Sequence, residues 1–210
     1  MSRWTPEGLR ALEAAPATVV DVGAGSGTPA LYDAYPDARH VLIEPLAERA
    51  AGLRTLAAGL PHGEVHVVAA GARREQRALR VEPRRHWRSS FLPRTPLTAT
   101  GDALETRTVE VTTLDHLREE RGLRPPFVVK IDTEGYELEV LEGARSVLAE
   151  TELVVAEVSV APRFVGGYRF AELIARLDAL GFALVDLLDV VRDETTDRLK
   201  LVDAAFRPAS

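Results

Sequence analysis

The stretch Phe127–Ala144, FVVKIDTEGYELEVLEGA, decides the fold of this 210-residue chain and locates its candidate site. It begins as an apolar strand that nevertheless carries Lys130 and Asp132, two positions apart and so on the same face of the strand. Burying charges inside a sheet is costly unless they are paired or in use. Of 26 basic residues only Lys130 and Lys200 are not arginine, so a compositional accident explains Lys130 poorly. We interpret the stretch as a reaction site.

Strand and helix signals alternate on both sides of this stretch, which is typical of a parallel sheet flanked by helices. Glu134 follows where the central strand should end, and Gly135 permits a turn into a helix. The other expected strands of this kind are 17–22, 39–44, 64–70 and 152–160, with further β segments at 76–81 and 107–112. The expected helices are 28–35, 46–60, 114–121, 137–149 and 170–180.

The C-terminal part breaks this alternation. Residues 182–190 and 199–206 read as strands joined by the polar turn DETTD, with no room for a helix between them. They must therefore pair as an antiparallel hairpin. The sequence predicts an α/β, Rossmann-like doubly wound fold. Its sheet has seven mostly parallel strands, a C-terminal antiparallel hairpin and helices on both faces.

Length and composition place limits on the class of protein. With 210 residues and 46% hydrophobic content, residues 1–210 are expected to form a single domain. No apolar run approaches the roughly 20 residues that span a bilayer, and no signal peptide is evident, so we expect a cytoplasmic enzyme without membrane contact. The absence of cysteine excludes disulfides and thiolate metal sites.

Charge is unevenly distributed along the chain. The net charge is -6, yet residues 71–100 contain eight arginines against Glu75 and Glu82. We interpret residues 73–106 as an Arg-rich insertion near the substrate site. It is either a solvated loop or an electrostatic lure for an anionic or carrier-bound acceptor. Nucleic acid is not expected, because the rest of the chain would repel phosphates. The candidate substrate-binding residues of this segment are Arg84, Trp87, Arg88 and Ser90.

A glycine-rich segment, Asp21–Gly27 (DVGAGSG), follows the first strand and opens a helix. Glycines there let the backbone turn tightly and approach a ligand closely. Glu44 ends the second strand, 17 residues beyond Gly27, where a carboxylate can accept both hydroxyls of a ribose. Thr28 stands where a dinucleotide fingerprint would have its last glycine, which favours S-adenosylmethionine over NAD. The candidate cofactor-binding residues are Asp21, Gly23, Ala24, Gly25, Gly27, Glu44, Pro45, Ala70 and Asp132.

These motifs resemble the FkbM-type family of S-adenosylmethionine-dependent methyltransferases. The segment VVKIDTEGYELEVLEGA is similar to the family's Lys-Ile-Asp-x-Glu-Gly signature and the helix after it, and YPDARHVLIEP resembles its second strand. VEVTTLDHL, VAEV and DAAF resemble other segments of the family, over 19–206 in all. Gly25 departs from the family, which commonly has Asn there, and the short segment before Val19 is not expected to cover the site. The resemblance implies a class I methyltransferase domain that acts on hydroxyls of sugars, polyketides and other natural products.

Transfer of a methyl group to a hydroxyl needs alignment of the reacting atoms and a base, which together can contribute several orders of magnitude in rate. Asp132 is the first candidate base, and Lys130 would hold it ionised or stabilise the developing alkoxide. Glu134, Glu157 and His86 are further candidates, and no metal is expected because a lysine competes for the same carboxylates. The alternatives are an NAD-dependent oxidoreductase or epimerase, a non-catalytic subunit that binds S-adenosylmethionine, and transfer to nitrogen or carbon. The residues leave the acceptor and the oligomeric state open.

Overall fold

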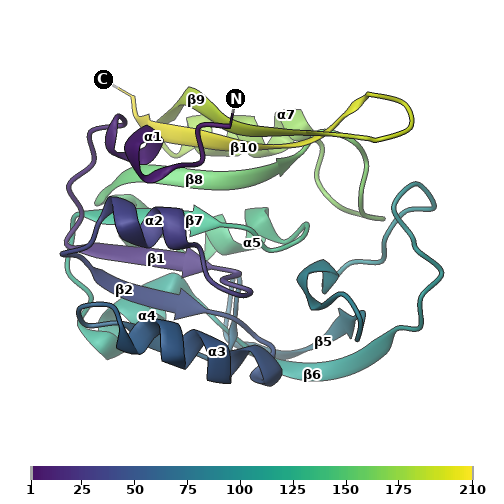
Figure 1. Cartoon of the computed structure of the whole chain (residues 1–210), viewed down its shortest axis with the longest axis horizontal. Coiled ribbons are helices and arrows are strands. Elements are labelled where there is room, and N and C mark those ends of the chain that lie inside the picture. Colours follow the sequence, from purple (N-terminus) through teal and green to yellow (C-terminus); the bar gives the residue numbers. More distant parts are fainter. Residues whose placement is uncertain (1, 210) are drawn as a thin grey trace.

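The computed structural model describes residues 2–209, and a seven-stranded sheet in the order β3-β2-β1-β7-β8-β10-β9 runs through the molecule (Figure 1). β10 is antiparallel to its neighbours β8 and β9, while the five strands from β3 to β8 in this order pair in parallel. This confirms the predicted sheet with its C-terminal hairpin. The strands are β1 (Thr18–Val22), β2 (Arg39–Ile43), β3 (Glu64–His66), β7 (Phe127–Ile131), β8 (Thr151–Ser159), β9 (Phe182–Arg192) and β10 (Leu199–Pro208).

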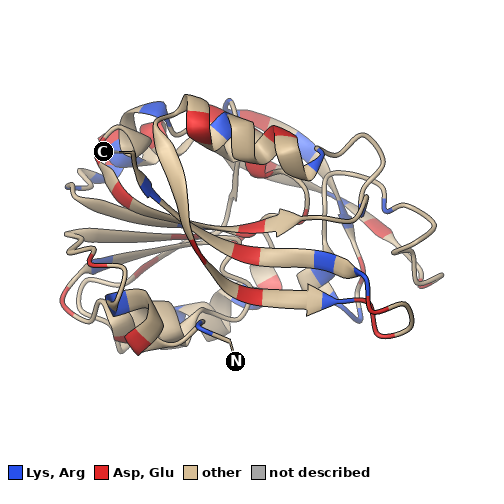
Figure 2. Ribbon diagram, turned by 90° about the horizontal axis from the view of Figure 1, so that it is seen from above, with Lys and Arg blue, Asp and Glu red and all other residues tan. Residues whose placement is uncertain are grey.

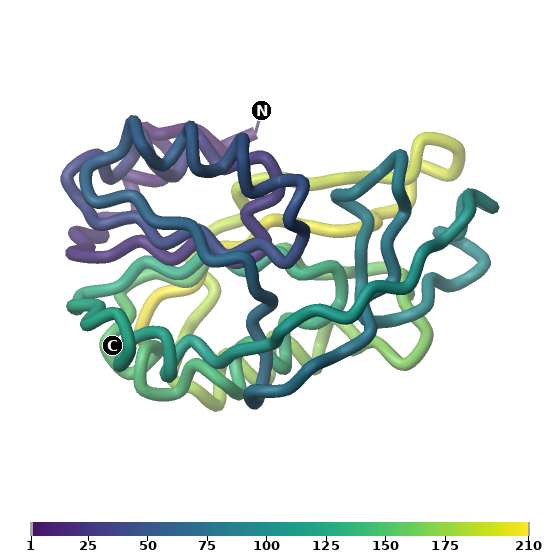
Figure 3. The backbone as a smooth tube through the Cα atoms, turned by 90° about the horizontal axis from the view of Figure 1, so that it is seen from below, coloured from purple at the N-terminus to yellow at the C-terminus, as the bar shows by residue number. Residues whose placement is uncertain are grey.

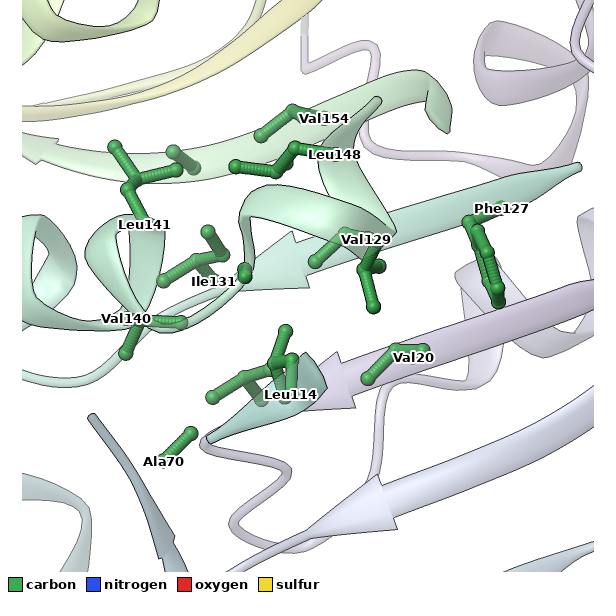
Figure 4. Packing of buried hydrophobic residues seen from close by; sticks show 14 of the residues in the cluster. Val20, Ala70, Leu114, Phe127, Val129, Ile131, Val140, Leu141, Leu148 and Val154 are labelled. Atoms are coloured by element: carbon green, nitrogen blue, oxygen red, sulfur yellow. The ribbon is translucent and has the colours of Figure 1, made fainter. Parts of the chain in front are cut away.

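Helices cover both faces of the sheet, as predicted. β7 lies in the middle of the sheet, and helices cover both of its faces, which explains its nearly continuous apolar sequence. Val129 and Ile131 of β7 pack toward Val140 and Leu141 of the helix that follows (Figure 4). One face is covered by α4 (Leu114–Arg121), α5 (Glu137–Glu142), α6 (Arg145–Leu148) and α7 (Phe170–Ala179), and the other by α1 (Pro6–Arg10), α2 (Pro29–Ala34) and α3 (Ala47–Ala58).

A second, three-stranded sheet has the order β4-β6-β5 and consists of β4 (Ala69–Ala70), β5 (Glu75–Val81) and β6 (Glu105–Thr112). The prediction of one strand over 64–70 was therefore wrong. β3 stays in the main sheet, whereas Ala69 and Ala70 turn away to pair with β6. Between β5 and β6 the chain forms the short 3₁₀ helix η1 (His86–Arg88) and long loops. In the tube view this segment extends beyond the carboxyl ends of the main strands (Figure 3).

The predicted helix over 137–149 is also divided, into α5 and α6. The break lies at Gly143, where an added Cβ would stand 2.0 Å from the carbonyl oxygen of Gly71. This close backbone approach fixes the helix pair against the loop after β4 and interrupts the regular helix. In the part of the chain that the structure describes, residues 2–209, no helix is long and apolar enough to cross a membrane.

Candidate active site

A cavity of about 470 Å³ opens at the carboxyl ends of β1, β2, β7 and β8, where open α/β sheets bind their ligands. Two groups of lining residues differ in character. The first, here called the glycine-loop side, comprises Gly23, Ala24, Gly25, Ser26, Gly27, Glu44, Pro45, Ala69 and Ala70. The second, here called the charged side, comprises Lys130, Asp132, Glu134, Glu157 and Asp203. Trp4, Trp87 and Phe91 add aromatic surface to the walls.

The glycine loop is held against the end of β2 by the backbone. The amides of Gly23 and Ala24 donate to the carbonyl oxygen of Ile43, at 2.9 and 3.0 Å. Gly23 has φ of +74°, and an added Cβ would lie 1.8 Å from the carbonyl oxygen of Asp132. Only glycine fits this position, because both its backbone conformation and its neighbour exclude a side chain. The loop therefore packs directly on the end of β7.

Glu44 is a buried carboxylate at the edge of the cavity. One of its oxygens accepts a hydrogen bond from the amide of Gly25 at 2.9 Å, and the other accepts from the amide of Leu46 at 3.0 Å. Burial raises the pKa of Glu44, and these two amides act in the opposite direction. Each oxygen keeps a further lone pair. Glu44 is thus oriented by the loop and the helix that it joins, and can accept hydroxyl groups.

Lys130 lies between two carboxylates. Its Nζ is 3.2 Å from Asp21 Oδ1 and 3.3 Å from Asp132 Oδ2, and it donates to the carbonyl oxygen of Gly23 at 3.1 Å. Burial alone would lower the pKa of Lys130, but the charges of Asp21 and Asp132 outweigh it and raise that pKa above its usual value. Lys130 is therefore a fixed positive charge that connects the glycine loop to Asp132.

Asp21 was a candidate cofactor-binding residue, but the structure places it away from the cavity. Asp21 is fully buried and does not line the cavity; it accepts a hydrogen bond from the hydroxyl of Tyr32 and faces Lys130. Asp132 is 36% exposed and does line the cavity. Asp21 thus supports Lys130 from beneath, on the face of the sheet covered by α2.

Two arginines that the sequence did not single out organise the other carboxylates. Arg163 Nη2 lies 2.6 Å from Glu134 Oε2, and its Nη1 contacts Glu157. Arg94 Nη2 donates to the same Glu134 oxygen at 2.8 Å. Burial raises the pKa of Glu157, as do Asp132 and Glu134, while Arg163 opposes them. Both arginines stand in loops without periodic patterning, so their sequence positions carry no signal that could have identified them.

The turn after β7 positions Glu134. Its backbone has φ of +53°, an uncommon conformation for a residue with a side chain. The buried carboxylate of Glu137 stabilises this turn, because its Oε1 accepts hydrogen bonds from the amide and hydroxyl of Thr133 and from the amide of Gly135. The EGYE sequence after β7 therefore encodes a rigid turn that directs Glu134 toward Arg94 and Arg163.

The candidate residues of the insertion divide into two groups. His86 and Trp87 line the cavity, and His86 Nε2 is 3.4 Å from Glu48 of α3. Arg84 is exposed outside the cavity lining, and Arg88 faces the buried Glu82 at 3.0 Å instead. Ser90 is also buried away from the cavity, where its hydroxyl donates to the carbonyl oxygen of Glu134 at 2.6 Å.

Trp4 lines the cavity from the N-terminal segment, which was not expected from the sequence to cover the site. Asp132, Glu134 and Glu157 bring carboxylate oxygens within 4.8 Å of one another, a spacing that a metal ion could use. Each of the three already faces a cation of the protein, namely Lys130, Arg94 or Arg163.

Fold and site together define a class I methyltransferase domain. Residues 21–184 match the model of the methyltransferase FkbM domain. The chain therefore belongs to the FkbM family, whose members use S-adenosylmethionine as the methyl donor.

Solved structures of methyltransferases share this fold. FkbM from Methylobacillus flagellatus KT is 16% identical, with 90% of this chain and 43% of that chain covered and a TM-score of 0.52. A Burkholderia thailandensis 1,6-didemethyltoxoflavin-N1-methyltransferase, solved with S-adenosylhomocysteine, is 13% identical over 98% and 76% of the two chains, with a TM-score of 0.50. A candidate O-methyltransferase from Klebsiella pneumoniae is 11% identical over 99% and 79%, with a TM-score of 0.54. This chain thus spans less than half the length of the first protein. No curated protein sequence matches it.

The residues present fit S-adenosylmethionine. The cavity volume lies within the range of cofactor sites, roughly 300–1,000 Å³. Glu44 offers two oriented oxygens to a ribose, and the glycine loop exposes backbone beside it. Ala70 and Pro45 give the neighbouring wall small apolar surfaces. These residues, together with Asp132, would hold the cofactor.

Proposed function

We propose that this chain transfers a methyl group from S-adenosylmethionine to a hydroxyl of a small molecule of the sugar or natural-product type. Bound S-adenosylmethionine supplies an electrophilic methyl group on a positively charged sulfur. The observation that carries the proposal is the position of Asp132. It is exposed to the cavity beside the glycine loop and faces Lys130 at 3.3 Å.

In this mechanism Asp132 accepts the hydroxyl proton. Lys130 contacts Asp132 at 3.3 Å and the carbonyl oxygen of Gly23 at 3.1 Å, and so holds Asp132 in place beside the glycine loop. Glu134 and Glu157 are less suited to this role because Arg94 and Arg163 already engage them. His86 lines the cavity from the insertion, and its Nε2 faces Glu48 at 3.4 Å. Membership of the FkbM family removes the NAD-dependent alternative.

Binding is tested first, by thermal shift with S-adenosylmethionine, S-adenosylhomocysteine and NAD. A ligand at about 100 times its dissociation constant stabilises a protein by about 2.7 kcal/mol. For a chain of this size that corresponds to a rise in Tm of very roughly 5–11 °C. We expect this shift with the two adenosyl compounds alone. A shift only with NAD would contradict the proposal.

Turnover is tested with isotope-labelled S-adenosylmethionine and a panel of hydroxylated small molecules, in the presence of EDTA. We expect Asp132→Asn to retain the fold but to lower turnover at saturating S-adenosylmethionine at least a hundredfold, a loss within the range for removing a general base. Unchanged turnover would exclude Asp132 as the base. Cofactor binding without transfer to any acceptor would favour a non-catalytic subunit, and a requirement for Mg²⁺ would contradict the metal-free mechanism.

A further inference from the structure

Lys130 of the charged side, and the two arginines that pair with its glutamates, each lie between two carboxylates of the protein. Lys130 faces Asp21 and Asp132, and Arg163 faces Glu134 and Glu157. Arg94 repeats the pattern between Glu134 at 2.8 Å and Glu82 at 3.6 Å. These cations are therefore committed to internal pairs, and none is left to bind an anion in the cavity.

Asp203 of β10 differs from its neighbours because, within residues 2–209, it has neither a hydrogen bond from its side chain nor an ion pair. It lines the cavity, and its register partners are Glu157 on β8 and Asp189 on β9. Directly opposed residues on adjacent strands share a face, so three carboxylates stand in a row across three strands. Like charges in such positions destabilise a sheet. Among the three, only Glu157 faces an arginine.

The arginines of the insertion do not compensate this charge. Among the described residues, no arginine lines the cavity. Arg88 faces Glu82, and Arg77 stacks over the rings of Phe91 and Tyr136. Basic and acidic positions are interleaved over the rest of the fold (Figure 2). The cavity field is therefore the reverse of what an anionic acceptor requires, and of the two readings of the Arg-rich segment we favour the solvated loop over the electrostatic lure.

Trp4 adds a second feature that suits a cation. The amide of Arg3 donates to the carbonyl oxygen of Leu188 on β9, next to Asp189, the register partner of Asp203. Trp4 thus enters the cavity lining beside the strand pair that carries Asp203. An indole face attracts ammonium groups, with an energy that grows when the pair is shielded from water. A carboxylate and an indole on one wall are the elements of an ammonium site.

We propose that the methyl acceptor carries a protonated amino group beside its hydroxyl, and that Asp203 and Trp4 bind that group. This inference rests on the proposed function, since it describes the acceptor part of the same cavity. Asp132 takes the hydroxyl proton, whereas Asp203 sets specificity by binding the charge. An amino sugar or another amino alcohol has the required chemistry.

The site should depend on pH in a defined direction. Burial and Asp132 raise the pKa of Asp203 to about 6, with Lys130 opposing and Asp189 adding to the shift; Glu157 faces the same group from β8. Asp203 becomes ionised as the pH rises through about 6, so affinity for an ammonium group should rise over the same interval. A raised carboxylate pKa means that the folded state loses stability as the pH rises from about 4, the ordinary aspartate value, to about 6, and Asp203→Asn should remove that loss.

The test uses the chain saturated with S-adenosylhomocysteine and three probes of similar shape: D-glucosamine, D-glucose and D-glucuronate. The two tryptophans give two indole N–H signals in the NMR spectrum, assigned with Trp4→Phe and Trp87→Phe. We expect D-glucosamine to shift the Trp4 signal with at least tenfold higher affinity than the other two probes, a difference of about 1.4 kcal/mol. Equal affinities, stronger binding of D-glucuronate, or no shift with D-glucosamine would overturn the proposal.

Two matched variants test which carboxylate binds the ammonium group. Asp203→Asn should lose the preference for D-glucosamine while retaining affinity for S-adenosylhomocysteine and gaining Tm above pH 6. Asp189→Asn removes the same charge one strand further out, from a residue outside the cavity lining, and should keep the preference. Retention of the preference in Asp203→Asn would overturn the assignment. Failure of S-adenosylhomocysteine to bind would instead refute the proposed function, so the two failures are distinguishable.

Discussion

The glycine-loop side and the charged side of the cavity are built by different physics. On the glycine-loop side the backbone makes the shape, and its one buried carboxylate, Glu44, is held by two amides. On the charged side the shape depends on ion pairs between side chains from separate segments, such as those that Arg94 and Arg163 form with Glu134. A wall formed by the backbone should keep its stability when one charge is removed. A network of buried ion pairs should lose stability, because the partner charge is left uncompensated. The comparison therefore predicts where a substitution will damage the fold and where it will damage only binding.

The largest effect is expected for Arg163→Met. This change leaves Glu134 without one of its two arginines and removes the arginine that faces Glu157, while a linear side chain of similar length fills the space. Removing one partner of a buried ion pair typically costs about 3–5 kcal/mol, because the remaining charge is uncompensated. Urea unfolding at neutral pH should show a loss of this size. The loss should shrink as the pH falls, because burial and neighbouring carboxylates raise the pKa of Glu157 and favour its neutral form.

Arg145→Met is the matched control. Arg145 also pairs with a glutamate, Glu142, but both side chains are well exposed, at 60% and 43%. Exposed pairs contribute about 0–1 kcal/mol. If the two variants lost similar stability, the charged side would not be held by its buried pairs.

This difference also explains what the sequence could and could not predict. The glycine loop and Glu44 directly follow strands, so periodicity and spacing identify them, and the KIDTEG segment is identified by its resemblance to the family signature. Arg163 and Trp4 stand in irregular segments, and only the folded chain brings Arg163 to the carboxylates of Glu134 and Glu157 and Trp4 to the cavity wall. Similarly, the Arg-rich segment predicted a positive surface near the substrate. Composition could not show that Arg88 turns toward Glu82 rather than toward the cavity.

The seven-stranded fold was accessible for a related reason. The spacing of apolar residues along the chain indicates which segments are buried strands or helices. The turn between the last two strands is too short for a helix, so the sequence predicted that they form a hairpin. The division of 64–70 between two sheets was not accessible, because Ala69 and Ala70 are equally compatible with either. The break at Gly143 depends on the approach of Gly71, a contact between segments far apart in sequence.

The next effect in size concerns the glycine-loop side. Gly23→Ala combines a strained φ with a Cβ 1.8 Å from the carbonyl oxygen of Asp132, so the loop must move away from β7. We expect a loss of about 2–4 kcal/mol, within the range for strained special positions. Affinity for S-adenosylhomocysteine should fall with it. Thermal shift with and without this ligand measures both quantities.

Gly25→Ala separates the cost of a positive φ from the cost of a steric clash with β7. Gly25 also has a positive φ, of +56°, but no heavy atom lies within 4 Å of an added Cβ. The backbone term alone is about 1–2 kcal/mol. Gly25→Ala should therefore destabilise the free protein less than Gly23→Ala. Equal destabilisation would show that conformation, and not contact with β7, constrains the loop.

The smallest effect is expected where the two sides meet. The hydroxyl of Tyr32 donates to Asp21, which faces Lys130, and Lys130 in turn contacts both the carbonyl oxygen of Gly23 and Asp132. Tyr32→Phe removes one hydrogen bond to a buried charge, at a cost of about 1.5–3 kcal/mol. Without that bond Asp21 should draw Lys130 toward itself and weaken its contact with Gly23.

Tyr35→Phe provides the control, because Tyr35 is also buried but donates to the carbonyl oxygen of Leu9, away from the cavity. Both variants should lose some stability, as urea unfolding would measure. Only Tyr32→Phe should also lose affinity for S-adenosylhomocysteine, measured by calorimetry. A parallel loss in both would mean that Tyr32 merely packs under the loop. A selective loss would establish that Asp21, although absent from the cavity wall, couples the two sides through Lys130.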